Sequence, residues 1–265
     1  MRLKYTIFIP AYKADKHIVN FCCNILRQTA KPDQIVIIDD TKNSEFFFDK
    51  IKKKFSELDK KIDITLIKNN TNLNAPISWN RYRKLFKNKL VFRMDVDDYW
   101  YPTHAVKMLN FYKLNKKSAV YTQMNECSLI KKLFFNYQFI GTNQALHSSC
   151  LFNFNVCDII YPVTNYAIDD LFIYIKLKYL LKKRISFVKF NTCKIITNAP
   201  HRWSNAASHG KKKIKLERKL YLYALKKKFM LKKFKFIYLY KIFFKFSLLQ
   251  SIYIISKLLY MRIIL

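Results

Sequence analysis

The stretch that decides the fold expected of this chain is Leu90-Val-Phe-Arg-Met-Asp-Val-Asp-Asp-Tyr-Trp-Tyr-Pro102. It begins as an apolar run and ends in three carboxylates, Asp95, Asp97 and Asp98, as does a buried strand that delivers acidic side chains at its carboxyl end. Acids are scarce in this chain, with 17 Asp and Glu against 50 Lys and Arg, and neighbouring carboxylates repel one another unless a cation lies between them. If the backbone is extended here, Asp95 and Asp97 lie on the same side and can share one hard divalent ion. The alternative is a solvated turn, where Asp is common.

Strand-like and helix-like segments alternate through the first half of the chain. Strands are predicted at residues 5–9 (ended by Pro10), 34–38, 63–67, 90–94 and 119–122, and helices at 15–28 (with Asp15 as N-cap), at 45–57 and after Pro76. The strands are apolar almost throughout, which is typical of a sheet covered on both faces. The alternation therefore predicts an α/β fold with a largely parallel sheet flanked by helices.

Acidic residues follow two of these predicted strands. Asp39 and Asp40 close the second strand, and Asp95, Asp97 and Asp98 close the fourth. In an open parallel sheet, ligands bind at the carboxyl ends of the strands. The two acidic groups are therefore expected to form one site at that edge of the sheet.

The formal net charge of +33 points first to a polyanionic partner. Lys, Asn, Ile, Phe and Tyr are all abundant, whereas glycine occurs only at Gly141 and Gly210, so a bias towards A/T-rich codons accounts for part of the lysine content. Residues 211–265 carry 16 Lys and Arg and a single acid, Glu217. These residues predict one or two basic amphipathic helices that lie on an anionic membrane surface. The alternative is a helical cap packed on the rest of the protein.

The chain shows no signal for export or for membrane spanning. Its longest uncharged stretch in the basic segment, Phe246–Ser256, is too short for a transmembrane helix, and the apolar run at residues 5–9 is too short for a signal peptide. The six cysteines include no Cys-x-x-Cys pair and are expected to be free thiols in a reducing cytosol. We therefore expect a cytoplasmic protein that associates peripherally with the cytoplasmic face of the membrane.

Taken together, the motifs resemble those of the family 2 glycosyltransferases with the GT-A fold. The resemblance rests on Ile9-Pro-Ala-Tyr-Lys13, Gln28-Thr29, Ile37-Ile-Asp-Asp-Thr41, Asn80, and Asp95-Val-Asp-Asp98 followed by Pro102. It covers residues 4–115, weakens over 140–205 and ends after 210. It implies a Rossmann-like GT-A catalytic domain over residues 1–209, and the basic segment at 210–265 is predicted to be a helical extension of that domain. The chain departs from the family pattern at Lys13, Thr41-Lys42 and Asp169, and lacks a glycine in the loop 69–75.

The resemblance also implies roles for individual residues. Donor binding falls to Pro10, Tyr12, Asp39, Asp40, Asn80, Asp95, Asp98 and Arg202, with Asp39 on the uracil and Arg202 on phosphate. The metal, Mn²⁺ or Mg²⁺, is assigned to Asp95 and Asp97, with Asp97 favoured for direct ligation, and to His201, which contacts metal or phosphate. Asp98 binds donor sugar hydroxyls or stabilises the turn. Asp170 is the implied general base, beside Asp169.

The function expected is therefore an inverting glycosyltransferase that moves a sugar from a nucleotide donor, most simply a UDP-sugar, to a hydroxyl of a cell-surface glycan or lipid-linked acceptor. Two alternatives belong to other classes. The first is a non-catalytic basic protein that binds nucleic acid or a membrane. Binding to nucleic acid is disfavoured, because no nucleic-acid motif is present. A nucleotidyltransferase is disfavoured because no glycine-rich loop follows the first strand.

Overall fold

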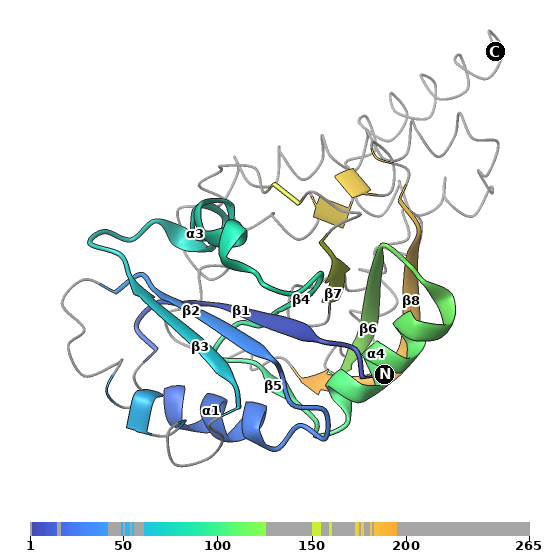
Figure 1. Ribbon diagram of the computed structural model, residues 1–265, viewed down its shortest axis with the longest axis horizontal. Coiled ribbons are helices and arrows are strands. Elements are labelled where there is room, and N and C mark those ends of the chain that lie inside the picture. Colours follow the sequence, from blue (N-terminus) through green and yellow to red (C-terminus); the bar gives the residue numbers. More distant parts are fainter. Residues whose placement is uncertain are drawn as a thin grey trace, which may run out of the picture.

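The fold is described from a computed structural model of the 265-residue chain (Figure 1). The structure describes residues 2–14, 17–41, 61–125, 150–154 and 183–194, together with a few positions between 49 and 55 and between 159 and 181. The predicted basic helices and the predicted domain boundary at residues 209 and 210 lie outside the described residues.

In the described part of the chain, eight strands form one sheet in the order β3-β2-β1-β4-β7-β6-β8-β5 (Figure 1). The strands are β1 (Tyr5–Ala11), β2 (Gln34–Asp39), β3 (Asp63–Lys68), β4 (Leu90–Arg93), β5 (Tyr99–Trp100), β6 (Ala119–Asn125), β7 (Cys150–Asn153) and β8 (Ile185–Lys194). Strands β1 to β4 are mutually parallel, and β6 is parallel to β8. Strand β7 is antiparallel to both β4 and β6, and β5 is antiparallel to β8. The α/β fold with a mostly parallel sheet is thereby confirmed.

Strand β1 continues through Pro10, so the prediction that this proline ends the strand is wrong. Alternate residues of β1 face different neighbours: the Ala11 carbonyl accepts a hydrogen bond from Asp40 N (2.8 Å) after β2, whereas the Phe8 carbonyl accepts one from Met94 N (3.0 Å) after β4. Pro10 therefore faces the β4 side. Its missing N–H removes no bond from the ladder between β1 and β2, which runs on to Ala11.

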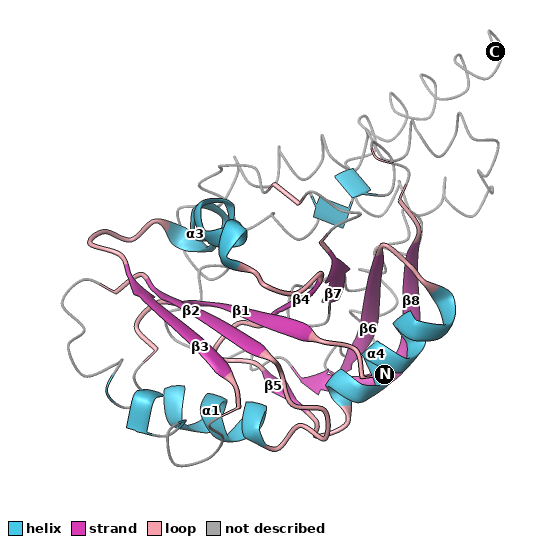
Figure 2. Cartoon of the chain, in the orientation of Figure 1, coloured by secondary structure: helices cyan, strands magenta, loops and turns pink. Residues whose placement is uncertain are grey.

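The described helices cover both faces of the sheet (Figure 2). They are α1 (Ile18–Leu26), α3 (Asn74–Tyr82) with the 3₁₀ turn η1 (Arg83–Leu85), and α4 (His104–Asn115). The N-cap of α1 is His17, without a side-chain capping bond, so the helix begins later than predicted and Asp15 is not its cap. Within the predicted helix 45–57, the described positions are helical.

Alternation along β1 builds a core on each face. Tyr5, Ile7 and Ile9 point to the face that packs against α1 and α4, in one cluster of fully buried side chains. Phe8 points to the other face, where its ring lies 5.1 Å from that of Trp79 in α3. Two buried faces explain why the strands lack polar alternation.

The first residue of α4, His104, is completely buried. Its Nδ1 lies 3.0 Å from Thr192 Oγ1, and its ring stacks on Trp100 with centroids 4.4 Å apart. The Nε2 atom is buried without a hydrogen-bond partner. Burial lowers the pKa of His104 to about 3, because the charged ring would lose its hydration, and the hydrogen bond to Thr192 offsets only part of that loss.

This histidine is expected to make the fold less stable in mild acid. The unfolded chain binds a proton at the ordinary histidine pKa of 6.5 and the folded chain does not, so stability is complete above that pH and falls as the pH drops towards 3. Between about pH 7.5 and 5.5 the free energy of unfolding should fall by about 1.4 kcal/mol for this site. Urea denaturation at both pH values checks it, and His104→Gln should remove most of the difference. An equal pH dependence in both proteins would contradict it.

Candidate functional site

The two acidic groups predicted to form a site lie on neighbours of the same central strand. Asp39 is the last residue of β2 and pairs in register with Ala11 at the end of β1. On the other side of β1, Arg93 pairs with Phe8, and Asp95 follows two residues later. Because β2, β1 and β4 are parallel and adjacent, both acidic groups are brought to one edge of the sheet, as predicted.

The acidic residues after β4 form a tight turn. Met94 N donates to the Phe8 carbonyl (3.0 Å) at the start of the turn, and Asp98 N donates to the Asp95 carbonyl (3.1 Å) within it. Asp95 and Asp97 are half-buried, whereas Asp98 is only 6% exposed. We call residues 95–98 the acidic turn.

A buried cation lies beside the acidic turn. The guanidinium of Arg93 has one nitrogen 3.6 Å from Asp95 Oδ1, and its side chain is almost fully enclosed. Cys193 of β8 is also near the acidic turn: burial, and then the charges of Asp98 and Asp95, raise the pKa of its thiol. The charge of Arg93 partly offsets the repulsion between the clustered carboxylates.

Asp39 is fully buried at the end of β2, and it orients Thr41, which connects the loops after β1 and β2. Its Oδ1 accepts a hydrogen bond from Thr41 N (2.8 Å), and the Thr41 hydroxyl accepts one from Lys13 N (2.7 Å). Lys13 has a φ of 50°, in the left-handed region that non-glycine residues seldom occupy. The departures from the family pattern at Lys13 and Thr41 thus bond to each other and join the loops after β1 and β2.

The adjacent Asp40 faces a different set of partners. Its carboxylate accepts hydrogen bonds from Asn69 Nδ2 (2.5 Å), after β3, and from Ser78 Oγ (3.1 and 3.2 Å), in α3. The Tyr82 hydroxyl donates to Asn69 Oδ1 and extends the network along α3. Burial raises the pKa of Asp40, although the hydrogen bonds from Asn69 and Ser78 act in the opposite direction.

Sequence reasoning did not find Asn69, Ser78 or Tyr82. The only signal available was that Ser78 and Tyr82 are four residues apart and so share one face of a helix. What the network does is fix α3, and with it the half-buried Asn80, against the carboxyl ends of β2 and β3.

The remaining predicted residues divide into described and undescribed ones. Pro10 is half-buried at the end of β1, and Tyr12 follows it with 42% of its surface exposed and the Lys13 ammonium 5.4 Å from its ring centre. Asp169, Asp170, His201 and Arg202 lie outside the described residues. The described part of the site is therefore the half predicted to bind the donor.

The chemistry of the acidic turn fits a hard divalent cation. The described residues contain no group of three or more His, Cys, Asp or Glu that could hold a metal ion by itself. Mg²⁺ and similar ions are commonly held by one or two carboxylates and by substrate phosphates. Half-buried Asp95 and Asp97, one residue apart on a turn, supply that number of oxygen ligands.

Comparison with known families decides the class of the protein. The model of the family described as "Glycosyl transferase family 2" matches residues 6–179. The chain belongs to this family. The match begins within β1, ends after β7 and includes both acidic groups. Among functionally curated proteins, none matches the chain closely enough to serve as a relative.

Solved structures with the same fold are GT-A glycosyltransferases. S. aureus TarS (residues 1–349) in complex with UDP-GlcNAc has a TM-score of 0.64 at 18% identity, over 82% of this chain and 65% of that one. The mannosyltransferase PcManGT from Pyrobaculum calidifontis, in complex with GDP-Man and Mn²⁺, has a TM-score of 0.59 at 15% identity, over 87% of this chain and 64% of that one. The chain thus spans slightly less than two thirds of these neighbours.

Two further observations concern membrane-spanning helices and disulfides in the described residues. No helix among the described residues is long and apolar enough to cross a membrane. The four described cysteines form no disulfide with one another.

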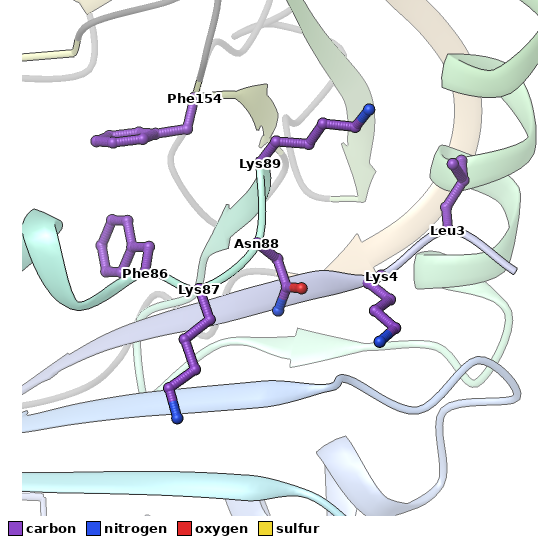
Figure 3. A pocket seen from close by; sticks show the side chains of 7 residues that line it. All are labelled: Leu3, Lys4, Phe86, Lys87, Asn88, Lys89 and Phe154. Atoms are coloured by element: carbon purple, nitrogen blue, oxygen red, sulfur yellow. The ribbon is translucent and has the colours of Figure 1, made fainter.

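A cavity of about 380 Å³ lies at the other end of the parallel strands (Figure 3). It is lined by Leu3, Lys4, Phe86, Lys87, Asn88, Lys89 and Phe154. Lys4 directly precedes β1 and Lys89 directly precedes β4, so the cavity belongs to the amino ends of these strands. The acidic turn follows the carboxyl end of β4, and the cavity is therefore not part of the candidate site.

Proposed function

We propose that this glycosyltransferase is an inverting enzyme that transfers a sugar from a UDP-sugar to an acceptor hydroxyl. The observation that carries the proposal is the convergence of Asp39 and the acidic turn on the two sides of β1. A nucleoside diphosphate needs one group to recognise its base and another to hold the cation that neutralises its diphosphate. The sheet edge provides a carboxylate for each.

The base-binding role falls to Asp39. Its buried carboxylate can accept a hydrogen bond from an N–H of the uracil, and Thr41 N already orients one of its oxygens. The TarS complex with UDP-GlcNAc supports a uridine donor, whereas the PcManGT complex holds GDP-Man, so guanine is the competing base. Pro10, Tyr12 and Asn80, from β1 and α3, are assigned to the same donor site.

The diphosphate role falls to the acidic turn. Asp95 and Asp97 would hold a Mn²⁺ or Mg²⁺ ion, with His201 as a further ligand and Arg202 on a phosphate. When bound, the ion neutralises charge that develops on the departing nucleoside diphosphate. Asp98 is buried in the turn, and its assigned role is to bind donor sugar hydroxyls or to hold the turn in shape.

The acceptor role falls to the pair Asp169-Asp170. Asp170 takes the proton of the acceptor hydroxyl as its oxygen attacks the anomeric carbon, and Asp169 adds negative charge beside it. The bond from the anomeric carbon to the phosphate oxygen breaks in the same displacement. UDP leaves with the bonding electron pair, and the configuration of the anomeric carbon inverts.

Replacement of Asp170 by Asn should separate turnover from donor binding. Removal of the general base is expected to lower the transfer rate at least about a hundredfold, because positioned proton transfer contributes about 10²–10⁴. Binding of UDP, measured by calorimetry, should stay within about threefold of the wild type, since the base acts on the acceptor. Asp158→Asn, in the same part of the chain, is the matched control. An Asp170→Asn protein with full turnover would contradict the assignment.

The acceptor and the place of action follow from the remaining sequence. We assign a catalytic domain to residues 1–209 and a basic extension to residues 210–265, which would hold the enzyme at an anionic membrane surface on the cytoplasmic side. A hydroxyl of a growing cell-surface glycan or of a lipid-linked sugar is an acceptor available at that place.

The first test is calorimetric binding of UDP and of GDP to the full chain, with Mn²⁺ and with EDTA. UDP should bind in Mn²⁺, bind at least tenfold more weakly in EDTA, and bind more tightly than GDP. Tighter binding of GDP would contradict the choice of uridine alone. Absence of binding by either nucleotide in Mn²⁺ would contradict the proposed donor site as a whole.

A further inference from the structure

The backbone that follows the acidic turn is held by a buried side chain of α1. Asn24 Nδ2 donates a hydrogen bond to the Trp100 carbonyl (2.6 Å), and Trp100 N donates one to Asn24 Oδ1 (3.0 Å). The two residues are 76 positions apart in the chain, and Asn24 is only 3% exposed. Both polar atoms of the amide are thus used on one peptide backbone.

These two bonds replace a missing neighbour strand. Strand β5 is the last in the sheet order and pairs only with β8, so its other edge has no strand beside it in the described part of the chain. A side-chain amide offers one donor and one acceptor, as a peptide group does. Asn24 therefore bonds to both backbone polar groups of Trp100, as a neighbouring strand would.

Gln28, two residues after the end of α1, extends the same contact. Its Nε2 donates to the Tyr101 carbonyl (3.1 Å), and its Oε1 accepts a hydrogen bond from Ala105 N (3.2 Å). Gln28 is fully buried, and its neighbour Thr29 donates through its backbone N–H to the Pro102 carbonyl (2.9 Å). The segment from residue 100 to residue 105 is thus bound to the end of α1 along its length.

The backbone is therefore fixed by hydrogen bonds on both sides of the acidic turn. Met94 is bound to Phe8 of β1 at one end, and Trp100 is bound to Asn24 at the other. Only the five residues 95–99 lie between them, and the bond from Asp98 N to the Asp95 carbonyl tightens that span further. Two carboxylates that share one ion must be held within a fraction of an ångström, so a fixed second anchor matters for both.

We propose that Asn24 and Gln28 are positioning residues that preorganise the acidic turn for a divalent cation. The inference rests on the proposed function, because it takes the turn to be the place where the cation binds. Neither residue touches the cation or the donor. Each acts through the backbone of Trp100 or Tyr101, and loss of either leaves Asp95 and Asp97 present but less well aligned.

The test measures Mn²⁺ affinity by electron paramagnetic resonance of free Mn²⁺, in the presence of saturating UDP, for the full chain. Asn24→Ala should raise the Mn²⁺ dissociation constant about tenfold or more, as is usual when a group that orients metal ligands is removed. Gln28→Met keeps an unbranched side chain of similar length and should also raise the Mn²⁺ dissociation constant. Because this variant retains the Asn24 bonds, it serves as the test if Asn24→Ala folds poorly.

The matched control is Asn153→Ala. Asn153 lies in β7 opposite Leu90, at the amino end of β4, and donates through Nδ2 to the Tyr112 hydroxyl (2.8 Å). This variant also loses a hydrogen bond inside the fold, but its Mn²⁺ dissociation constant should stay within about twofold of the wild type. Thermal unfolding, recorded for all variants, separates lost stability from lost alignment.

The outcomes are distinguishable. Equal Mn²⁺ affinities in the wild type, Asn24→Ala and Gln28→Met would overturn the positioning role and leave the proposed function intact. An equal loss in Asn153→Ala would overturn it as well, because general destabilisation would then explain the effect. A wild type that binds UDP without Mn²⁺ would overturn both this inference and the proposed metal site, while the nucleotide site would stand.

Discussion

Replacement of Asp97 by Asn is expected to reduce sugar transfer by at least about a thousandfold while leaving the fold intact. Asn keeps the shape of the side chain but removes one of the two charges proposed to hold the cation. The donor diphosphate then faces the remaining carboxylates without full neutralisation. Because that charge grows as the leaving group departs, the loss should fall on the rate of transfer as well as on metal binding. Initial rates at saturating UDP-sugar and Mn²⁺ check this expectation.

The matched control for this variant is Asp63→Asn. Asp63 is a half-exposed residue at the amino end of β3, and its Oδ2 lies 2.7 Å from the exposed Lys87 ammonium. Exposed ion pairs of this kind contribute little to stability, so the control should keep its fold and its rate. An Asp97→Asn protein that retains more than about a tenth of the wild-type rate would refute the role given to Asp97.

Replacement of Trp79 by Ala is expected to destabilise the fold by about 3–5 kcal/mol. Trp79 is fully buried in α3, and its ring lies 5.1 Å from those of Phe8 and Phe86 and 6.1 Å from that of Phe152. Its Nε1 donates to the Ile159 carbonyl (2.8 Å). The substitution leaves a cavity among aromatic rings and an acceptor without its donor, and both effects lower stability.

Urea denaturation followed by circular dichroism measures this effect. Leu114→Ala is the control, because Leu114 in α4 is 84% exposed and its truncation should change stability by no more than about 0.5 kcal/mol. Trp79 lies between Ser78, which bonds to Asp40, and Asn80, which is assigned to the donor site. Loss of α3 packing should therefore weaken UDP binding too. A destabilisation below about 1 kcal/mol would show that the aromatic cluster around Trp79 does not hold α3 in place.

Much of the first half of the fold could be predicted from the chain alone. The runs that became β2 and β4 are apolar because both faces of the sheet are covered there, and such runs are visible without any tertiary information. The convergence of Asp39 with the acidic turn was also predictable, since parallel neighbouring strands end at one edge. The predictions were least successful where a local rule met a tertiary exception, as at Pro10.

Strand β6 was predicted at residues 119–122, but β5, β7 and β8 were not, for a different reason. Strand β5 has only two residues and exists because it pairs with β8. Strand β7 has four residues and joins β4 to β6, and β8 follows β6 with two register shifts. Segments this short or irregular carry too little periodicity to identify, and long-range pairing decides their conformation.

The amino-acid sequence by itself determined the α/β class, the family and the identity of the acidic residues at the sheet edge, because these depend on local patterns of apolar and charged side chains. Only the tertiary structure decided that Asp40 bonds to Asn69 and Ser78 while Asp39 bonds to the loop at Thr41, and that Asn24 holds the backbone of Trp100. These contacts join residues up to 76 positions apart. The partner of a buried polar group is set by which elements pack together, and that choice leaves no periodic trace in the chain.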